Sequence, residues 1–335
     1  MESDRRVLLL TGHAIQSYKS TDEIELSELS TFTAIYTYYF RKILEEMGRF
    51  EIYMAYFQGE KYEGPYYGEM ELPEVEHTIG LQNKVFKARP ELFERVRGIT
   101  SGKVCVIGDH DHDIGPEDVI FHARETQQDP PAPQSRWIGW GADPAIFYPE
   151  KSENILSVFV DGVYYVDTRK DDLTEEILMH VLNELPGNIM HTEFDGFRLR
   201  TIGKEGLTTI NSPEEAHAAT RGSNPRIPYP DLAREMRQAH IFISGHSESM
   251  GLSALEACMS GASLIIPRIY RKPFIKPDLI RDLHHMYVEV EEDPIQIPWE
   301  LVFEEMDEEK SVAMAEDKTW RSVVERVVRV LDSDN

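Results

Sequence analysis

The sequence predicts an α/β protein built from two doubly wound domains, and three observations support this. The chain has 335 residues, more than the roughly 100–200 of a single domain. Its content of 41% apolar and 10% aromatic residues is typical of a globular protein rather than a disordered one. Short apolar runs also alternate with segments whose apolar residues recur every three to four positions, as in strands that alternate with helices.

The first half shows this alternation from its start. An apolar run typical of a buried strand ends at the turn Thr11-Gly12-His13. A helix with periodic apolar residues follows and ends at Gly48, a natural C-cap. The expected elements are strands over 6–10, 50–57, 104–107 and 119–121, a helix over about 31–48, and a long loop over 58–78 that is rich in Gly, Tyr and Pro.

The second half repeats the scheme. The expected elements are strands over 155–160, 241–244, 262–266 and 287–290, and helices over 173–185, 231–240, 251–260 and 319–331. The segment 272–318 is acidic, and we expect it to be less regular. We therefore predict an N-terminal domain over 1–150, a C-terminal domain over 151–318, and a terminal helix over 319–335.

The charge excludes some classes of partner. The 35 Lys and Arg residues against 60 Asp and Glu residues give a net charge of −25, which opposes bulk electrostatic binding to nucleic acid or anionic lipid. No apolar run approaches the roughly 18–20 residues of a membrane span, and the run at 7–10 is too short for a signal peptide. The two cysteines, Cys105 and Cys258, form no disulfide framework, so we expect a cytoplasmic protein.

The window from Arg226 to Arg268 is the most informative part of the chain. It contains a helix, a strand, the loop Gly245–Ser253 and a second helix. The free N–H groups at the start of that second helix can hold an anion, and Gly251 would let the backbone approach a phosphate closely. Glu248 and Glu256, which are separated by seven residues, can both face one ligand cleft at the carboxyl edge of a parallel sheet.

These residues carry a resemblance. The stretch ESMGLSALEACMSGASLIIP, which runs from Glu248 and contains Glu256, resembles the donor-site motif of retaining GT-B glycosyltransferases of the family-4-like group (glycosyl transferases group 1). The segments 227–233 and 140–149 and the final helix, with Trp320, also resemble parts of that family. The resemblance implies the GT-B fold, in which two Rossmann-like domains face each other across a cleft and a C-terminal helix crosses back to the first domain.

The resemblance also implies roles for residues in the donor site. It assigns Glu256 to the ribose hydroxyls of a nucleotide and Glu248 to a hydroxyl of the donor sugar. The backbone of the helix start would meet the diphosphate; these residues are Met250, Gly251, Leu252 and Ser253. Two glutamates around a helix start can also be a capping carboxylate and a solvated face.

Positive charge on the departing phosphates would stabilise the transition state. Arg169 and Lys170 lie in the loop where the family places an Arg and a Lys, although a solvated pair at a helix start is the alternative. Gly12 takes the position of the family's first glycine-rich loop, and a turn after the first strand explains it equally well.

The segment 108–113, Gly-Asp-His-Asp-His-Asp, follows a predicted strand. Its alternating side chains point to opposite faces when extended, so few could share one metal ion. The resemblance places an active-site histidine here, and His110 fits that position slightly better than His112. A solvated acidic loop is the alternative.

The resemblance implies a hexosyl- or pentosyltransferase that moves a sugar, with retention, from a UDP- or GDP-linked donor to an acceptor hydroxyl. No metal or other cofactor is expected, and the acceptor would be a glycan, a lipid or a small molecule. The basic stretch Arg268–Lys276 keeps a phage-type transferase acting on hydroxymethylated DNA bases as an alternative. Another GT-B enzyme, such as a phosphorylase or nucleotide-sugar epimerase, and a non-catalytic nucleotide-sugar-binding protein are further alternatives.

Overall fold

The chain divides into two compact units in a computed structural model. The structure describes residues 5–11, 21–29, 32–56, 72–81, 90–107, 118–122, 135–152, 154–162, 173–203, 206–220, 227–245, 252–269, 285–290 and 295–333. Unit 1 comprises Met1–Glu125, Asp129–Trp140 and Trp320–Asn335, and unit 2 comprises Thr126–Gln128 and Gly141–Thr319. The domain bounds at residues 150 and 318 stay predictions.

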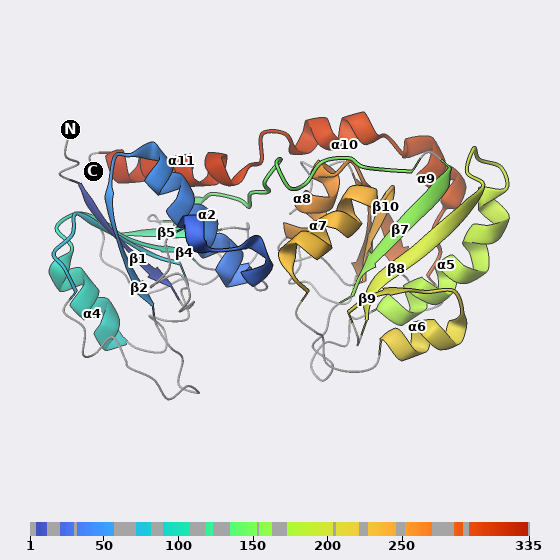
Figure 1. Cartoon of the computed structure of the whole chain (residues 1–335), viewed down its shortest axis with the longest axis horizontal. Helices are drawn as coiled ribbons and strands as arrows, with labels where there is room; N and C mark the ends of the chain where they lie inside the picture. Colours follow the sequence, from blue (N-terminus) through green and yellow to red (C-terminus); the bar gives the residue numbers. More distant parts are fainter. Residues whose placement is uncertain are drawn as a thin grey trace. The chain divides into compact units, whose positions relative to one another are not determined.

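Unit 1 is a parallel sheet with helices (Figure 1). Its elements are β1 (Arg6–Thr11), η1 (Thr21–Glu23), η2 (Leu26–Glu28), α2 (Phe32–Met47), β2 (Glu51–Tyr56), β3 (His77–Gly80), α4 (Pro90–Ile99), β4 (Val104–Ile107), β5 (Val119–His122), β6 (Ser135–Trp137) and α11 (Trp320–Asp332). The strand order is β2-β1-β3-β4-β5-β6, and every neighbouring pair is parallel. In β1, residues 7–10 are all at most 1% exposed, as expected for a strand covered on both faces.

Two predictions about the helices of unit 1 are confirmed. Helix α2 ends before Gly48, whose φ of +62° is the left-handed conformation of a glycine cap. The last helix, α11, packs on α2, and the ring of Trp320 lies 5.1 Å from Tyr36 and 5.4 Å from Tyr39. Lys103 holds the carboxyl end of α11 by donating to the carbonyl of Val330 at 2.7 Å. The chain therefore returns to unit 1 at its end.

Unit 2 has a second six-stranded sheet (Figure 1). Its elements are β7 (Ile155–Asp161), α5 (Thr174–Ile189), β8 (Gly196–Gly203), β9 (Gly206–Thr209), α6 (Pro213–Ala219), α7 (Tyr229–Gln238), β10 (Ile241–Ser244), α8 (Leu252–Met259), β11 (Ser263–Ile269), β12 (His285–Val290), α9 (Trp299–Glu305) and α10 (Glu308–Ala315). The order is β12-β11-β10-β7-β8-β9, with only β8 and β9 antiparallel among these pairs. The strand order therefore reverses between β7 and β10, which is where open α/β sheets bind ligands.

Two expectations about irregular segments are wrong in part. The loop expected over 58–78 reaches too far, because β3 begins at His77 and pairs with β1. The acidic segment 272–318 contains the helices α9 and α10 besides β12, which includes the strand expected over 287–290. Trp299 and Val302 of α9 are buried in the core of unit 2, and the Asp307 carboxylate caps α10 by accepting from the Lys310 N–H at 2.8 Å. Helices of two turns show too little periodicity to be recognised within an acidic sequence.

Candidate functional site

The carboxyl ends of β7 and β10 meet at the reversal point of unit 2. Gly245, directly after β10, donates its N–H to the carbonyl of Asp161 at 2.7 Å and accepts from the N–H of Leu173 at the same distance. A Cβ atom on Gly245 would lie 2.6 Å from the Asp161 carbonyl oxygen and would also collide with Thr174. Only glycine therefore fits at this position, where the ends of β7 and β10 lie against the start of α5.

Glu256 lies in the second turn of α8, the helix that follows β10. Its side chain is 2% exposed, and its Oε1 accepts a hydrogen bond from the Tyr229 hydroxyl at 2.7 Å. Burial raises the pKa of Glu256 to about 8; the bond from Tyr229 lowers it and the charge of Asp161 adds to the rise. Among the described residues, no cation forms an ion pair with this carboxyl, so an ordinarily charged group is kept largely neutral at pH 7.

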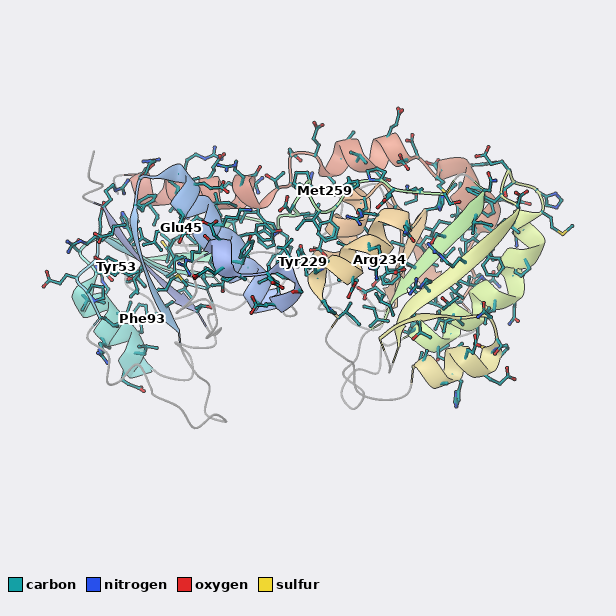
Figure 2. All side chains as sticks on the ribbon, in the orientation of Figure 1. Glu45, Tyr53, Phe93, Tyr229, Arg234 and Met259 are labelled. Carbon is teal, nitrogen blue, oxygen red and sulfur yellow. The ribbon has the colours of Figure 1, made fainter. Side chains whose placement is uncertain are left out.

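Tyr229 is the first residue of α7 and is 1% exposed (Figure 2). The ring of Phe147 packs against it edge-on, with centroids 5.4 Å apart and planes at 66°. Phe147 lies in the segment 140–149 that the sequence analysis singled out, and its N–H closes a turn onto the carbonyl of Asp143 at 2.9 Å. Two of the sequence segments that resemble the family thus meet at the residue that holds Glu256.

The structure describes three of the predicted site residues. Glu256 is buried, and Leu252 and Ser253 are half-buried in the first turn of α8. The other predicted site residues lie outside the described residues: Gly12, His110, Arg169, Lys170, Glu248, Met250 and Gly251. His112, and all of the basic stretch 268–276 except the backbone of Arg268 and Ile269, lie outside them as well.

Sequence reasoning assigned no role to three residues that the structure brings to this site. Tyr229 stands between two prolines, at the start of a segment that resembles the family. Asp161 is the polar residue directly after a predicted apolar strand, and Gly245 directly follows another. In a parallel sheet, residues at these positions share the ligand edge, so the signal was present for Asp161 and Gly245. No sequence pattern pairs Tyr229 with Glu256.

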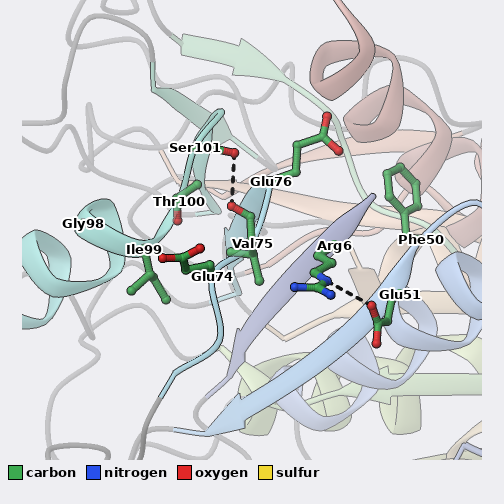
Figure 3. A pocket seen from close by; sticks show the side chains of 10 residues that line it. All are labelled: Arg6, Phe50, Glu51, Glu74, Val75, Glu76, Gly98, Ile99, Thr100 and Ser101. Carbon is green, nitrogen blue, oxygen red and sulfur yellow. Dashed lines mark hydrogen bonds and ion pairs between the residues drawn. The ribbon is translucent and has the colours of Figure 1, made fainter. Parts of the chain in front are cut away.

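Unit 1 has a hollow of about 1150 Å³ (Figure 3). Its lining includes Arg6 at the start of β1, Glu51 at the start of β2, and Glu76 just before β3. Arg6 is already paired with Glu51 at 3.2 Å. The hollow is at the amino ends of the strands, opposite the edge at which such sheets bind ligands, so it does not define the candidate site.

In the part of the chain that the structure describes, no group of three or more His, Cys, Asp or Glu side chains is arranged to hold a metal ion. Likewise, no helix in that part is long and apolar enough to cross a membrane.

Comparisons with known proteins give structural neighbours only. No protein-family profile and no curated protein sequence matches the chain. Among solved structures, MurG from Acinetobacter baumannii matches with a TM-score of 0.52 and 11% identity over 97% of this chain and 99% of that chain. The calicheamicin glycosyltransferase CalG4 matches with a TM-score of 0.40 and 10% identity over 99% and 94%. The glycosyltransferase SnogD from Streptomyces nogalater matches with a TM-score of 0.42 and 11% identity over 98% and 99%.

The likeness to MurG covers nearly the whole of both chains, so it extends to both units. MurG is a GT-B glycosyltransferase with two Rossmann-like domains. The chain therefore has the GT-B fold, as its sequence predicts.

Proposed function

We propose that the chain is a retaining glycosyltransferase that moves a sugar from a nucleotide-diphosphate sugar, UDP- or GDP-linked, to an acceptor hydroxyl. The donor binds in unit 2 at the carboxyl edge of its sheet. In the reaction, the bond from the anomeric carbon to the phosphate oxygen breaks and a bond to the acceptor oxygen forms. The acceptor proton passes to the departing phosphate oxygen.

The observation that carries this proposal is the environment of Glu256. A buried carboxyl that no described cation neutralises is expensive for a fold, and such groups concentrate at functional sites. Ribose hydroxyls are hydrogen-bond donors that favour the charged form of a carboxyl. The position beside the reversal point of the strand order, where open α/β sheets bind nucleotides, supports the same role.

The remaining roles rest on the resemblance in sequence. Glu248 would bind a hydroxyl of the donor sugar, and the start of α8 would hold the diphosphate through its N–H groups. Arg169 and Lys170 would neutralise the leaving phosphates, so that no metal is needed. His110 would contact the sugar or the acceptor.

A thermal-shift panel of UDP-, GDP-, ADP- and TDP-sugars tests the donor class. A donor at one hundred times its Kd stabilises the fold by about 2.7 kcal/mol, which raises the Tm by roughly 5 to 10 °C for a domain of this size. The same donors with Glu256→Gln are the matched control. If no nucleotide sugar shifts the wild-type Tm, the proposal is wrong.

The stereochemical outcome tests retention. With the donor identified by the panel and water or a simple sugar as acceptor, proton NMR of the first product should show the anomeric configuration of the donor. A product of inverted configuration would keep the transferase and overturn the retaining mechanism.

A further inference from the structure

We propose that Tyr229, held in place by Phe147, is a positioning residue that orients the Glu256 carboxyl for a vicinal diol, the ribose of a nucleotide. The inference rests on the proposed function, because it names the means by which the donor site selects ribose. It also gives a role to two sequence segments that resemble the family but have no function assigned to them here, 140–149 and 227–233.

The Tyr229 hydroxyl forms a hydrogen bond that orients the Glu256 carboxyl. The phenol donates to Oε1 of Glu256 at 2.7 Å, and it is the carboxyl's hydrogen-bond partner within the described part of the chain. A carboxylate has room for about four hydrogen bonds and a phenol supplies one. Since a single donor fixes one oxygen, the second oxygen keeps its capacity for the two hydroxyl donors of a diol.

The phenol of Tyr229 is itself held in place by its surroundings. Tyr229 is 1% exposed, and it is flanked by Pro228 and Pro230, whose rings fix their φ angles. The N–H groups of Asp231 and Leu232 both bond to the carbonyl of Pro228, at 2.9 and 3.2 Å. A side chain on so constrained a helix start presents its hydroxyl in one place.

The segment 143–150 packs against α7. Phe147 contacts the Tyr229 ring at the start of the helix. At the other end, Arg237 pairs with Glu150 at 3.1 Å and stacks over Tyr148 at 4.8 Å. The segment 143–150 therefore fastens both ends of α7, the helix whose Tyr229 donates to Glu256 of α8.

The test uses the full chain and a pair of probes that differ only in the diol. The probes are the ribonucleotide among UDP, GDP and ADP that binds the wild type most tightly, and its 2′,3′-dideoxy analogue. The wild type should bind the ribonucleotide more tightly. In Tyr229→Phe the affinity for the ribonucleotide should fall about tenfold or more, as for a lost hydrogen bond to a charged group, while the affinity for the dideoxy analogue stays within about twofold.

Tyr53→Phe is the matched control. The Tyr53 hydroxyl also donates to a glutamate, Glu51, at 2.7 Å, but in unit 1 (Figure 2). This variant should bind both probes as the wild type does. If the role of Tyr229 were merely structural, Tyr229→Phe would lower the affinity for both probes equally, and that result overturns the proposal.

A second variant keeps the test decisive if Tyr229→Phe does not fold. Phe147→Leu retains the phenol of Tyr229 but loosens the packing against it. This variant should lower the affinity for the ribonucleotide selectively, and by less than Tyr229→Phe does. An equal loss of affinity for both probes in Phe147→Leu counts against the proposal.

The wild type alone separates the two levels of inference. If it binds none of the probes, the donor site itself is wrong and the proposed function fails with it. If it discriminates the diol and both variants discriminate it equally well, the proposed function stands and the positioning role of Tyr229 is overturned.

Discussion

Two glutamates in the described part of unit 2 are almost fully buried, and their side chains bind different partners. Glu235 on α7 is 4% exposed and forms an ion pair with Arg200 of β8 at 2.9 Å. Glu256 on α8 is 2% exposed, and its hydrogen-bond donor among the described residues is the neutral hydroxyl of Tyr229. Both contacts involve α7, because Glu235 and Tyr229 belong to the same helix.

The difference separates a structural carboxyl from a functional one. A buried carboxylate paired with a cation is already balanced, so its role ends with fastening α7 to the sheet. A buried carboxyl whose hydrogen-bond donor is a phenol rather than a cation favours its neutral form, and a ligand that supplies further donors stabilises it most. The following experiments test this difference, from the largest expected effect to the smallest.

Arg200→Leu should have the largest effect on stability. It leaves the Glu235 charge buried and without its partner, and breaking such a pair lowers the free energy of unfolding by about 3–5 kcal/mol. Urea unfolding followed by circular dichroism measures this. The double variant Arg200→Leu/Glu235→Leu is the control and should recover most of the loss, since an apolar pair of similar volume is often as stable as a buried ion pair.

The two Glu→Gln variants should have opposite consequences. Glu256→Gln removes the charge available to a ribose diol, so nucleotide affinity should fall by about 10- to 100-fold, with no loss of stability at pH 8. Glu235→Gln should lower the free energy of unfolding and leave nucleotide affinity unchanged. Isothermal titration measures the nucleotide affinity of each variant, and urea unfolding measures its free energy of unfolding. An equal loss of nucleotide affinity in both variants would contradict the assignment of Glu256 to the donor site and of Glu235 to a structural role.

The fold was readable from the sequence because parallel strands and amphipathic helices have strong patterns. Runs such as Leu8–Leu10 and Ile241–Ile243 are buried on both faces. Helix α11 is long enough for the periodicity of its apolar residues to be recognised. Short elements such as β9 and α6 were missed, since four to seven residues carry little periodicity. The place of β9 is fixed by its antiparallel pairing with β8, which the local sequence does not indicate.

The candidate site was readable only in part. Glu256 was found because its spacing from Glu248 and its surrounding residues resemble a known motif. Its hydrogen bond from Tyr229 joins residues that are 27 positions apart, and its coupling to Asp161 spans another strand. Those contacts come from the packing of α7, α8 and β7, which the sequence of each segment does not contain.

The pH dependence of stability should distinguish Glu256 from an ordinary surface glutamate. Its pKa rises from 4.5 in the unfolded chain to about 8 in the fold, where Tyr229 and Asp161 face it. The folded state therefore holds a proton that the unfolded state has released, so this stabilisation is complete below about pH 4.5 and is lost as the pH rises through 8. Glutamine does not titrate.

The unfolding free energy of Glu256→Gln relative to the wild type should thus increase by about 1.4 kcal/mol per pH unit between pH 5 and 8, and level off above. Urea unfolding of both proteins at half-unit steps of pH measures this slope. A difference that is independent of pH would show that the carboxyl is charged in the fold, and the contrast with Glu235 would then fail.

Arg234→Ala should have the smallest effect, and it decides which cation neutralises Glu235. Arg234 lies on α7 (Figure 2), pairs with Asp231 at 3.0 Å, and approaches Glu235 only to 4.0 Å with its side chain 52% exposed. An exposed pair of this kind contributes about 0.5 kcal/mol or less, so the free energy of unfolding should change by no more than that. If Arg234→Ala destabilised the protein as much as Arg200→Leu, solvent-exposed charge would share in balancing Glu235. A buried cationic partner would then no longer distinguish Glu235 from Glu256. Only the hydrogen bond from Tyr229 to Glu256 would distinguish them.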